Sequence, residues 1–447
     1  MPDEMTASGL PHHFAHLMQE LLPDGAPPAG FAVAVSGGSD SMALALLSAG
    51  WAAKTGIPLI ALSVDHGLRP TSGAEAERVQ RWLTVRGIET KLLKWDGPYP
   101  KTGIQEAARE ARYRLMQDYC ARHGIGVLLL GHQLEDQLET LLMRLSKGSG
   151  LEGLAAMQRK SSAGRLSLLR PLLSVRRETL RAYLRAEKQD WIDDPSNENP
   201  VFTRTRVGAV LTEMQQLPGS DLDSIALSLA RLQRASQSLD DLARQKIEES
   251  CEISPLGFIR LSQAALDDCP DELALRILNA LIRSVGGGQR IRLQALEQLY
   301  VRLFRDKAGK SATLAGAQLQ ASGSDWLVCR EPGRAGLAEM EITPEEREWI
   351  WDNRFLVTDR APDSPRSASL RIAALGTDGA RQLREHLDEK DLPRIPAKVR
   401  ASLPALWSGA EVVAAPLLVA GKSDCFPLNH RFSMKFRAFY WIPGSIL

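Results

Sequence analysis

The stretch Phe31-Ala32-Val33-Ala34-Val35-Ser36-Gly37-Gly38-Ser39-Asp40-Ser41 runs directly into Met42-Ala43-Leu44-Ala45-Leu46-Leu47. The apolar residues 31–35 favour a strand, and the later apolar run favours a helix. Between them, Gly37 and Gly38 let the backbone turn with its N–H groups pointing inward, and the start of the helix adds partial positive charge. The stretch therefore predicts a strand–loop–helix unit whose loop binds phosphate.

Other phosphate-binding patterns do not fit this loop. No Lys follows the glycines as in a Walker A loop, and the spacing is not GxGxxG. A plain structural alternative is a Ser/Gly turn in which Ser36 or Ser39 caps the helix. The complete string instead resembles the signature of the PP-loop (N-type) ATP pyrophosphatases, which cleave ATP to AMP and pyrophosphate. The resemblance implies that Ser36, Gly37, Gly38, Ser39, Asp40 and Ser41 bind ATP and that Asp40 holds Mg²⁺.

Composition sets the protein class. A chain of 447 residues with 44% hydrophobic residues predicts a soluble protein of about two or three domains. The net charge of +1 gives no global nucleic-acid signal, so any basic surface must be local. Five scattered cysteines without a Cys-x-x-Cys pair indicate reduced thiols. The apolar run 412–420 contains Pro416 and is too short to span a bilayer. We expect a cytoplasmic protein with no membrane partner.

Strands and helices alternate between residues 31 and 147. The predicted strands are Phe31–Val35, Leu59–Val64, Thr90–Trp95 and Val127–Leu130, and the clearest helices are Ile104–Arg122 and Leu134–Ser146. This alternation predicts an α/β fold with a doubly wound parallel sheet, Rossmann-like, whose ligands lie at the carboxyl ends of the strands.

Two further groups are expected at this edge. Val64 and His66 end the second strand, where they line a nucleotide pocket or simply close a strand with a surface His. Arg109 and Arg112 share one helix face beside Tyr113. Such arginines either pair with acids in solvent or stabilise charge on an α-phosphate.

The helix after the fourth strand carries Asp136 and Glu139 at i, i+3. Acids early in a helix complement its dipole, an alternative that explains Glu135 adequately. A carboxylate pair at the edge of a sheet also suits recognition of an amine or a metal. His132 closes the fourth strand as a ligand donor or a surface residue.

One segment, residues 159–188, is strongly basic. It holds nine Lys and Arg residues against two acids, and Arg204 and Arg206 follow. With so few acids to pair with, it indicates contact with a phosphate backbone rather than a solvated helix face. The basic candidates taken forward are Arg170, Arg176, Arg177, Arg204 and Arg206.

The sequence as a whole predicts three domains. Residues 1–217 form the catalytic domain, 218–335 a mainly helical domain, and 336–447 a small α/β domain; the last two are candidates for nucleic-acid binding. The tail 431–441 mixes basic and aromatic residues, which favours a half-buried edge strand over an RNA surface.

Taken together, the motifs resemble the tRNA(Ile) lysidine synthetase family. The resemblance adds Gly131-His132, the loop 148–153 and Asp194-Pro195-Ser196-Asn197 to the phosphate loop, and covers residues 31–206 densely. It implies that ATP adenylates C2–O of the wobble cytidine in the CAU anticodon of tRNA(Ile), and that free lysine then displaces AMP.

The resemblance also implies residue roles. Val64 and His66 join the ATP site, Arg112 steadies the α-phosphate, and His132 lies where the base enters. Asp136 and Glu139 bind lysine, and the five arginines above bind tRNA. Thr205 and Gly208 depart from the usual Arg-Asn-x-x-Arg pattern, which leaves the role of that spot open. A homodimer is also left open.

Rival functions fit less well. A tRNA thiolation enzyme of the same superfamily needs reactive cysteines, yet Cys120 is the only Cys in the catalytic half. A non-catalytic ATP sensor would not need the basic segment or the added domains.

Overall fold

The computed structural model describes residues 6–22, 28–68, 71–97, 103–163, 166–193, 203–216, 221–343, 346–361, 369–384, 395–418, 428–429 and 431–437. These residues form two compact units that divide between Ser236 and Gln237. Each unit is described separately, and the predicted division into three domains remains a prediction.

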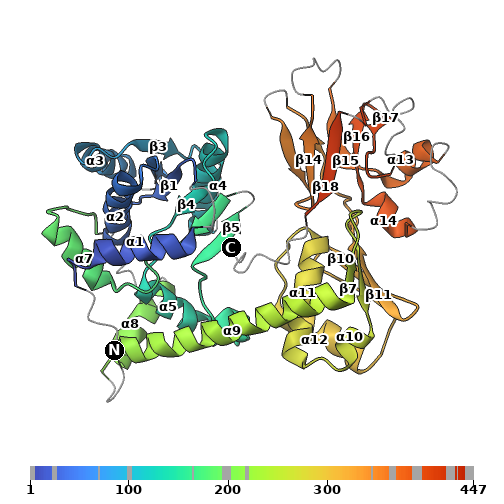
Figure 1. Cartoon of the computed structure of the whole chain (residues 1–447), viewed down its shortest axis with the longest axis horizontal. Helices are drawn as coiled ribbons and strands as arrows, with labels where there is room; N and C mark the ends of the chain where they lie inside the picture. The colour runs from blue at the N-terminus through green and yellow to red at the C-terminus, as the bar shows by residue number, and fades with distance from the viewer. Residues whose placement is uncertain are drawn as a thin grey trace. The chain divides into compact units, whose positions relative to one another are not determined.

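A six-stranded sheet forms the centre of the first unit (Figure 1). Its strands are β1 (Phe31–Ala34), β2 (Leu59–Asp65), β3 (Thr90–Lys94), β4 (Val127–Leu129), β5 (Lys160–Ala163) and β6 (Leu166–Leu169). Their order is β3-β2-β1-β4-β6-β5, and all neighbours are parallel except β5 and β6. The predicted α/β fold with a largely parallel sheet is confirmed. Because the chain turns from one side of β1 to the other, the crevice for a ligand is expected where β1 and β4 end.

Helices cover both faces of this sheet. On one face, α1 (Leu10–Leu21), α2 (Ser39–Thr55), α3 (Ser72–Val85) and α7 (Arg177–Ala186) share a core with Phe31, Val33 and Val35. On the other, α4 (Ile104–Arg122) packs with Ala32 and its neighbours. Successive residues of a strand point to opposite faces, so the apolar run at 31–35 serves both cores.

A helical layer follows the sheet along the chain. It consists of α5 (Leu134–Leu145), α6 (Leu151–Leu154), α8 (Thr203–Met214) and the start of α9 (Leu222–Ser250). Leu134, Leu138 and Leu141 form one stripe of α5 and pack with Leu211 and Leu229 in a separate core. This stripe fixes which face of α5 remains for polar side chains.

The second unit is rich in antiparallel sheet. A five-stranded sheet, ordered β7-β8-β11-β10-β9, follows α9 in the chain. Its strands are β7 (Cys251–Ile253), β8 (Ile259–Ser262), β9 (Ser311–Leu314), β10 (Ala317–Ser322) and β11 (Asp325–Arg330). The accompanying helices are α10 (Ala264–Asp267), α11 (Asp271–Gly286), α12 (Leu293–Tyr300) and the π-helix η2 (Val301–Arg305).

Two smaller sheets complete this unit. One is ordered β12 (Met340–Glu341), β15 (Arg371–Ala374), β16 (Pro404–Ser408), β17 (Glu411–Ala414), and the other β13 (Glu348–Trp351), β14 (Phe355–Asp359), β18 (Phe432–Phe436). Two short helices, α13 (Gly376–Leu383) and α14 (Ala397–Ala401), accompany them. Among the described residues, β18 is the last strand of its sheet, pairs with β14 and alternates in burial, so the edge-strand interpretation is confirmed for residues 432–436. Among the described helices, none is long and apolar enough to cross a membrane.

Candidate active site

The phosphate loop is held by its own side chains. The backbone N–H of Ser36 donates to Oγ of Ser41 at 3.2 Å, and that hydroxyl donates to the carbonyl of Gly38 at 3.0 Å. Gly38 is the N-cap of α2, and no side chain caps the helix. The predicted alternative, a cap by Ser36 or Ser39, is therefore wrong. The first N–H groups of α2 stay available to an anion.

Close contacts explain why glycine stands in this loop. Gly37 has φ of +92°, and a Cβ there would lie 2.7 Å from Cγ2 of Val79. The carbonyl of Gly37 accepts the N–H of Ile192 at 2.9 Å, so the chain after α7 crosses the loop. At Gly131, a Cβ would lie 3.1 Å from Cα of Ser41. That close approach brings His132, the next residue, to the start of α2.

Three charged side chains meet beside the loop. Nε of Arg177 lies 3.5 Å from Oδ2 of Asp40, and its Nη2 lies 3.5 Å from Oδ1 of Asp136. Burial raises the pKa of Asp40 above its ordinary value, although the guanidinium of Arg177 opposes this. Residues from the starts of α2, α5 and α7 thus form one ionic cluster.

The start of α5 orients its carboxylates. Gln133 and Asp136 form a capping box, in which the N–H of Gln133 donates to Oδ2 of Asp136 at 3.1 Å. The structural explanation for an early acid therefore applies to Asp136, whose second oxygen still faces Arg177. Glu139 is also buried, with 8% of its surface exposed. Gly208 of α8 faces it, since a Cβ there would lie 3.7 Å from Oε1 of Glu139.

The second strand and α4 supply the other predicted residues. Val64 and His66 are half-buried at the end of β2, where Nδ1 of His66 accepts the N–H of Leu68 at 3.2 Å. On α4, the Cζ atoms of Arg109 and Arg112 lie 5.4 and 5.8 Å from the centroid of the Tyr113 ring. Within the described part of the chain, neither arginine forms a salt bridge with an acid. Burial lowers the pKa of Arg112, and an anion would offset that desolvation.

The predicted tRNA-binding arginines lie in different environments. Arg170 is buried and donates to the carbonyl of Gln158 at 3.1 Å and to Oγ of Ser161 at 2.9 Å. Arg176 is partly exposed and pairs with Asp223 of α9. Arg206 is exposed on α8. The side chains of Arg204 and Thr205, and the segment 194–197, lie outside the described residues. The tRNA role of all five arginines remains a prediction.

Sequence reasoning missed two contributions. It assigned Arg177 to tRNA alone, because its ion pairs join residues that are far apart in the chain. It also gave no role to Gln137, which donates to the carbonyl of Met157 at 2.8 Å and accepts its N–H at 2.7 Å. In the sequence, the only signal for such a role was the position of Gln137 beside the apolar stripe of α5.

The metal-binding potential of the site is modest. Among the described residues, no group of three or more His, Cys, Asp or Glu side chains is placed to hold a metal. Mg²⁺ is commonly bound by one or two carboxylates together with substrate phosphates, so Asp40 beside a phosphate loop fits it. In the structure this carboxylate pairs with the guanidinium of Arg177.

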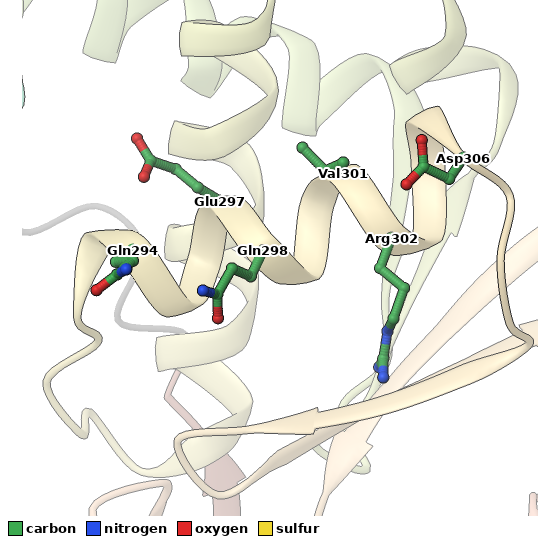
Figure 2. A pocket seen from close by; sticks show the side chains of 6 residues that line it. All are labelled: Gln294, Glu297, Gln298, Val301, Arg302 and Asp306. Carbon is green, nitrogen blue, oxygen red and sulfur yellow. The ribbon is translucent and has the colours of Figure 1, made fainter.

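A shallow pocket lies elsewhere, on the second unit. Figure 2 shows side chains of α12 and η2 around it: Gln294, Glu297, Gln298, Val301, Arg302 and Asp306. These side chains spread along α12, η2 and the residue that follows η2, and none of them is a Ser, Thr, Cys, Lys or His. The pocket belongs to neither the phosphate loop nor the ionic cluster.

The chain is similar to one protein family and to several curated proteins that share one name. Residues 10–214 match the family model of a PP-loop domain. A protein of Ruegeria pomeroyi named tRNA(Ile)-lysidine synthase is 33% identical over 392 residues, which cover 88% of this chain and 89% of that protein. Proteins of the same name from Methylobacterium nodulans and Wolbachia pipientis wMel are 38% and 33% identical, covering 72% and 73% of this chain and 96% and 76% of theirs.

Proposed function

Because the chain belongs to the tRNA(Ile)-lysidine synthase family, we propose that it ligates free lysine to C2 of the wobble cytidine in the CAU anticodon of tRNA(Ile). One observation supports this proposal most. The phosphate loop leads into α2, whose start no side chain caps, and the carboxylates of Asp40 and Asp136 lie beside it at the same edge of the sheet. A site for a triphosphate and a site for an amine are thereby adjacent.

The proposed reaction has two steps. First, C2–O of the cytidine attacks the α-phosphorus of ATP, and pyrophosphate leaves. Second, the ε-amine of lysine, after losing a proton, attacks C2, and the C2–O bond breaks to release AMP. The product carries a C–N bond in place of the C–O bond.

Each residue has a role in this proposal. Ser36, Gly37, Gly38, Ser39 and Ser41 hold the leaving pyrophosphate with the N–H groups of α2. Arg112 stabilises charge on the α-phosphate, and Val64 and His66 line the nucleotide pocket. Asp40 would hold Mg²⁺, which neutralises phosphate charge when bound. Asp136 and Glu139 bind the lysine ammonium, and His132 lies where the base enters.

Thiolation, the main rival, receives no support from the cysteines. Burial raises the pKa of Cys120 to about 11, so its thiol stays protonated and unreactive at neutral pH. We propose tRNA(Ile) and free lysine as the substrates and the cytoplasm as the compartment. A homodimer is tested by sedimentation of the full chain.

The deciding experiment measures lysine transfer. The full chain is incubated with ATP, Mg²⁺, radiolabelled lysine and unmodified CAU-anticodon tRNA(Ile), and label in acid-precipitable RNA is counted. We expect ATP-dependent incorporation that falls at least 100-fold in Asp40→Asn, about the contribution of one charge-stabilising group. Asp118→Asn, an exposed carboxylate of α4, should match the unsubstituted chain. AMP formation without incorporation would reject lysine as the substrate.

A further inference from the structure

The side chain of Arg177 pairs with both of the carboxylates that are proposed to bind ligands. Arg177 lies 3.5 Å from Asp40, the residue for Mg²⁺, and 3.5 Å from Asp136, a residue for lysine. The guanidinium is planar and rigid, so a displacement that separates it from one carboxylate also changes its position relative to the other. A single internal cation therefore stands where two ligands would bring their own positive charges.

The protein holds Arg177 in this position. Its backbone N–H donates to Oε2 of Glu135 at 3.0 Å, which ties the start of α7 to α5. Asp136 is fixed by the capping box with Gln133. Both ends of the contact thus belong to well-anchored helix starts.

The neighbouring arginine on α7 is engaged differently. Arg181 pairs with Asp193 at 3.2 Å, and its Cζ lies 5.9 Å from the ring of Trp191. Its charge influences Asp40 only from a distance. Contact with the two carboxylates is therefore specific to Arg177 within α7, not a general property of this basic helix.

We propose that Arg177 is a positioning residue that couples the two ligand sites: in the ligand-free chain it occupies Asp40 and Asp136 together, and the first ligand displaces it for the second. This inference rests on the proposed function for the identity of the second ligand.

The coupling follows from competition between cations. A Mg²⁺ ion held by Asp40 together with ATP would take the place of the guanidinium of Arg177 as the partner of that carboxylate. Arg177 then moves, and Asp136 loses this internal cation before lysine arrives. Lysine binds without having to displace Arg177, so its affinity rises. By linkage, lysine raises the affinity for the Mg²⁺ nucleotide by the same factor.

Calorimetric titration of the full chain tests this. The lysine Kd is measured with and without Mg²⁺ and a non-hydrolysable ATP analogue. We define the ratio as the lysine Kd without the nucleotide divided by the Kd with it. In the unsubstituted chain, this ratio should be about fivefold or more. In Arg177→Gln, lysine should bind more tightly without nucleotide, and the ratio should approach one. Arg177→Lys, which keeps the charge but not the planar fork, should give an intermediate ratio.

Arg185→Gln is the matched control. Arg185 lies on the same helix and pairs with exposed Glu178, away from both carboxylates. The substitution removes the same charge, so it should leave the ratio unchanged. An Arg177→Gln chain with an unaltered ratio, or a weaker lysine affinity, would overturn the proposal and leave Arg177 with a structural role.

A metal titration separates this inference from the proposed function. Mn²⁺ alone, followed by electron paramagnetic resonance, should bind Arg177→Gln several-fold more tightly than the unsubstituted chain, and Asp40→Asn should abolish the difference. If lysine binds neither form, the proposed substrate is wrong, and the Mn²⁺ result decides whether Arg177 occupies the cation site. Equal Mn²⁺ affinities would reject that occupancy.

Discussion

Gly37 shows how one residue joins the fold of this protein to its site. Its positive φ lets the loop turn, and its missing side chain leaves room for Val79 of α3 and for Ile192. The same absence of a side chain leaves the N–H groups of the loop accessible. We therefore expect both the stability of the loop and the proposed phosphate binding to depend on the lack of a side chain at Gly37.

We predict that Gly37→Ala destabilises the protein more than Gly56→Ala does. Both positions have positive φ, +92° and +72°, but only at Gly37 would an added Cβ meet other atoms within 4 Å. Ala at residue 56 carries the backbone cost alone, about 1–2 kcal/mol. Overpacking at residue 37 adds about 1–3 kcal/mol. Urea unfolding of the full chain measures both, and equal losses would show that α3 and residue 192 yield without cost.

At the scale of the element, α5 organises the site through its buried polar side. Gln137 satisfies both backbone groups of Met157, and Nη1 of Arg144 donates to the carbonyls of Gly153 and Ala156 at 2.8 and 3.1 Å. The segment 153–157, which follows α5 in the chain, is thus fixed to the helix that carries Asp136 and Glu139.

We predict that Gln137→Ala loosens the attachment of the segment 153–157 to α5. Removing the amide leaves the N–H and C=O of Met157 without their partner, at a cost of about 2–4 kcal/mol for the two bonds. Amide hydrogen exchange in residues 151–158 should accelerate at least 10-fold. Gln245→Ala, which removes only an exposed bond to Glu249 on α9, should leave this segment unchanged. Protection that survives in Gln137→Ala would show that the remaining contacts, those of Arg144 and the bond from Nε2 of Gln233 to the carbonyl of Ala155, hold this segment.

How much the sequence predicts depends on how local each signal is. The bounds of α4 agree with the prediction, 104–122, because a continuous helix-forming run is a local property. The hairpin β5–β6 was not predicted, since Lys160-Ser161-Ser162-Ala163 has weak strand preference and becomes a strand by pairing with β6. Helix α12 continues into the π-helix η2, and the spacing of apolar residues does not predict this change of helix type.

The candidate site divides in the same way, into positions that local sequence signals predict and contacts that they do not predict. The phosphate loop, His132, Asp136 and Glu139 lie at strand and helix ends, so topology places them at one edge of the sheet. The contact of Arg177 with Asp40 and Asp136 joins α2, α5 and α7, and only tertiary packing determines it. Long-range ion pairs have no periodic signature, which is why this one was not expected.

At the scale of the whole molecule, charge limits how the proposed tRNA binding can work. With a net charge of +1, the chain as a whole does not attract a polyanion, so affinity must come from local contacts with phosphates. Arg176 is partly exposed, and in the proposed complex it would exchange its pairing with Asp223 for a phosphate; Arg206 is exposed on α8. Such contacts release counterions, which makes the affinity depend on salt.

We therefore predict that Arg176→Gln and Arg206→Gln each reduce the slope of log Kd for tRNA(Ile) against log salt by about 0.7–0.9, one phosphate contact each. Filter binding between about 50 and 300 mM salt measures the slope. Arg81→Gln on α3, which is exposed and paired with Glu77, removes an equal charge outside the basic segment and should leave the slope unchanged. If Arg81→Gln lowered the slope as much as the other two, the tRNA would be responding to total charge. An unchanged slope in all three would instead move the tRNA contact to other parts of the chain, since a phosphate contact cannot be lost without losing its counterion release.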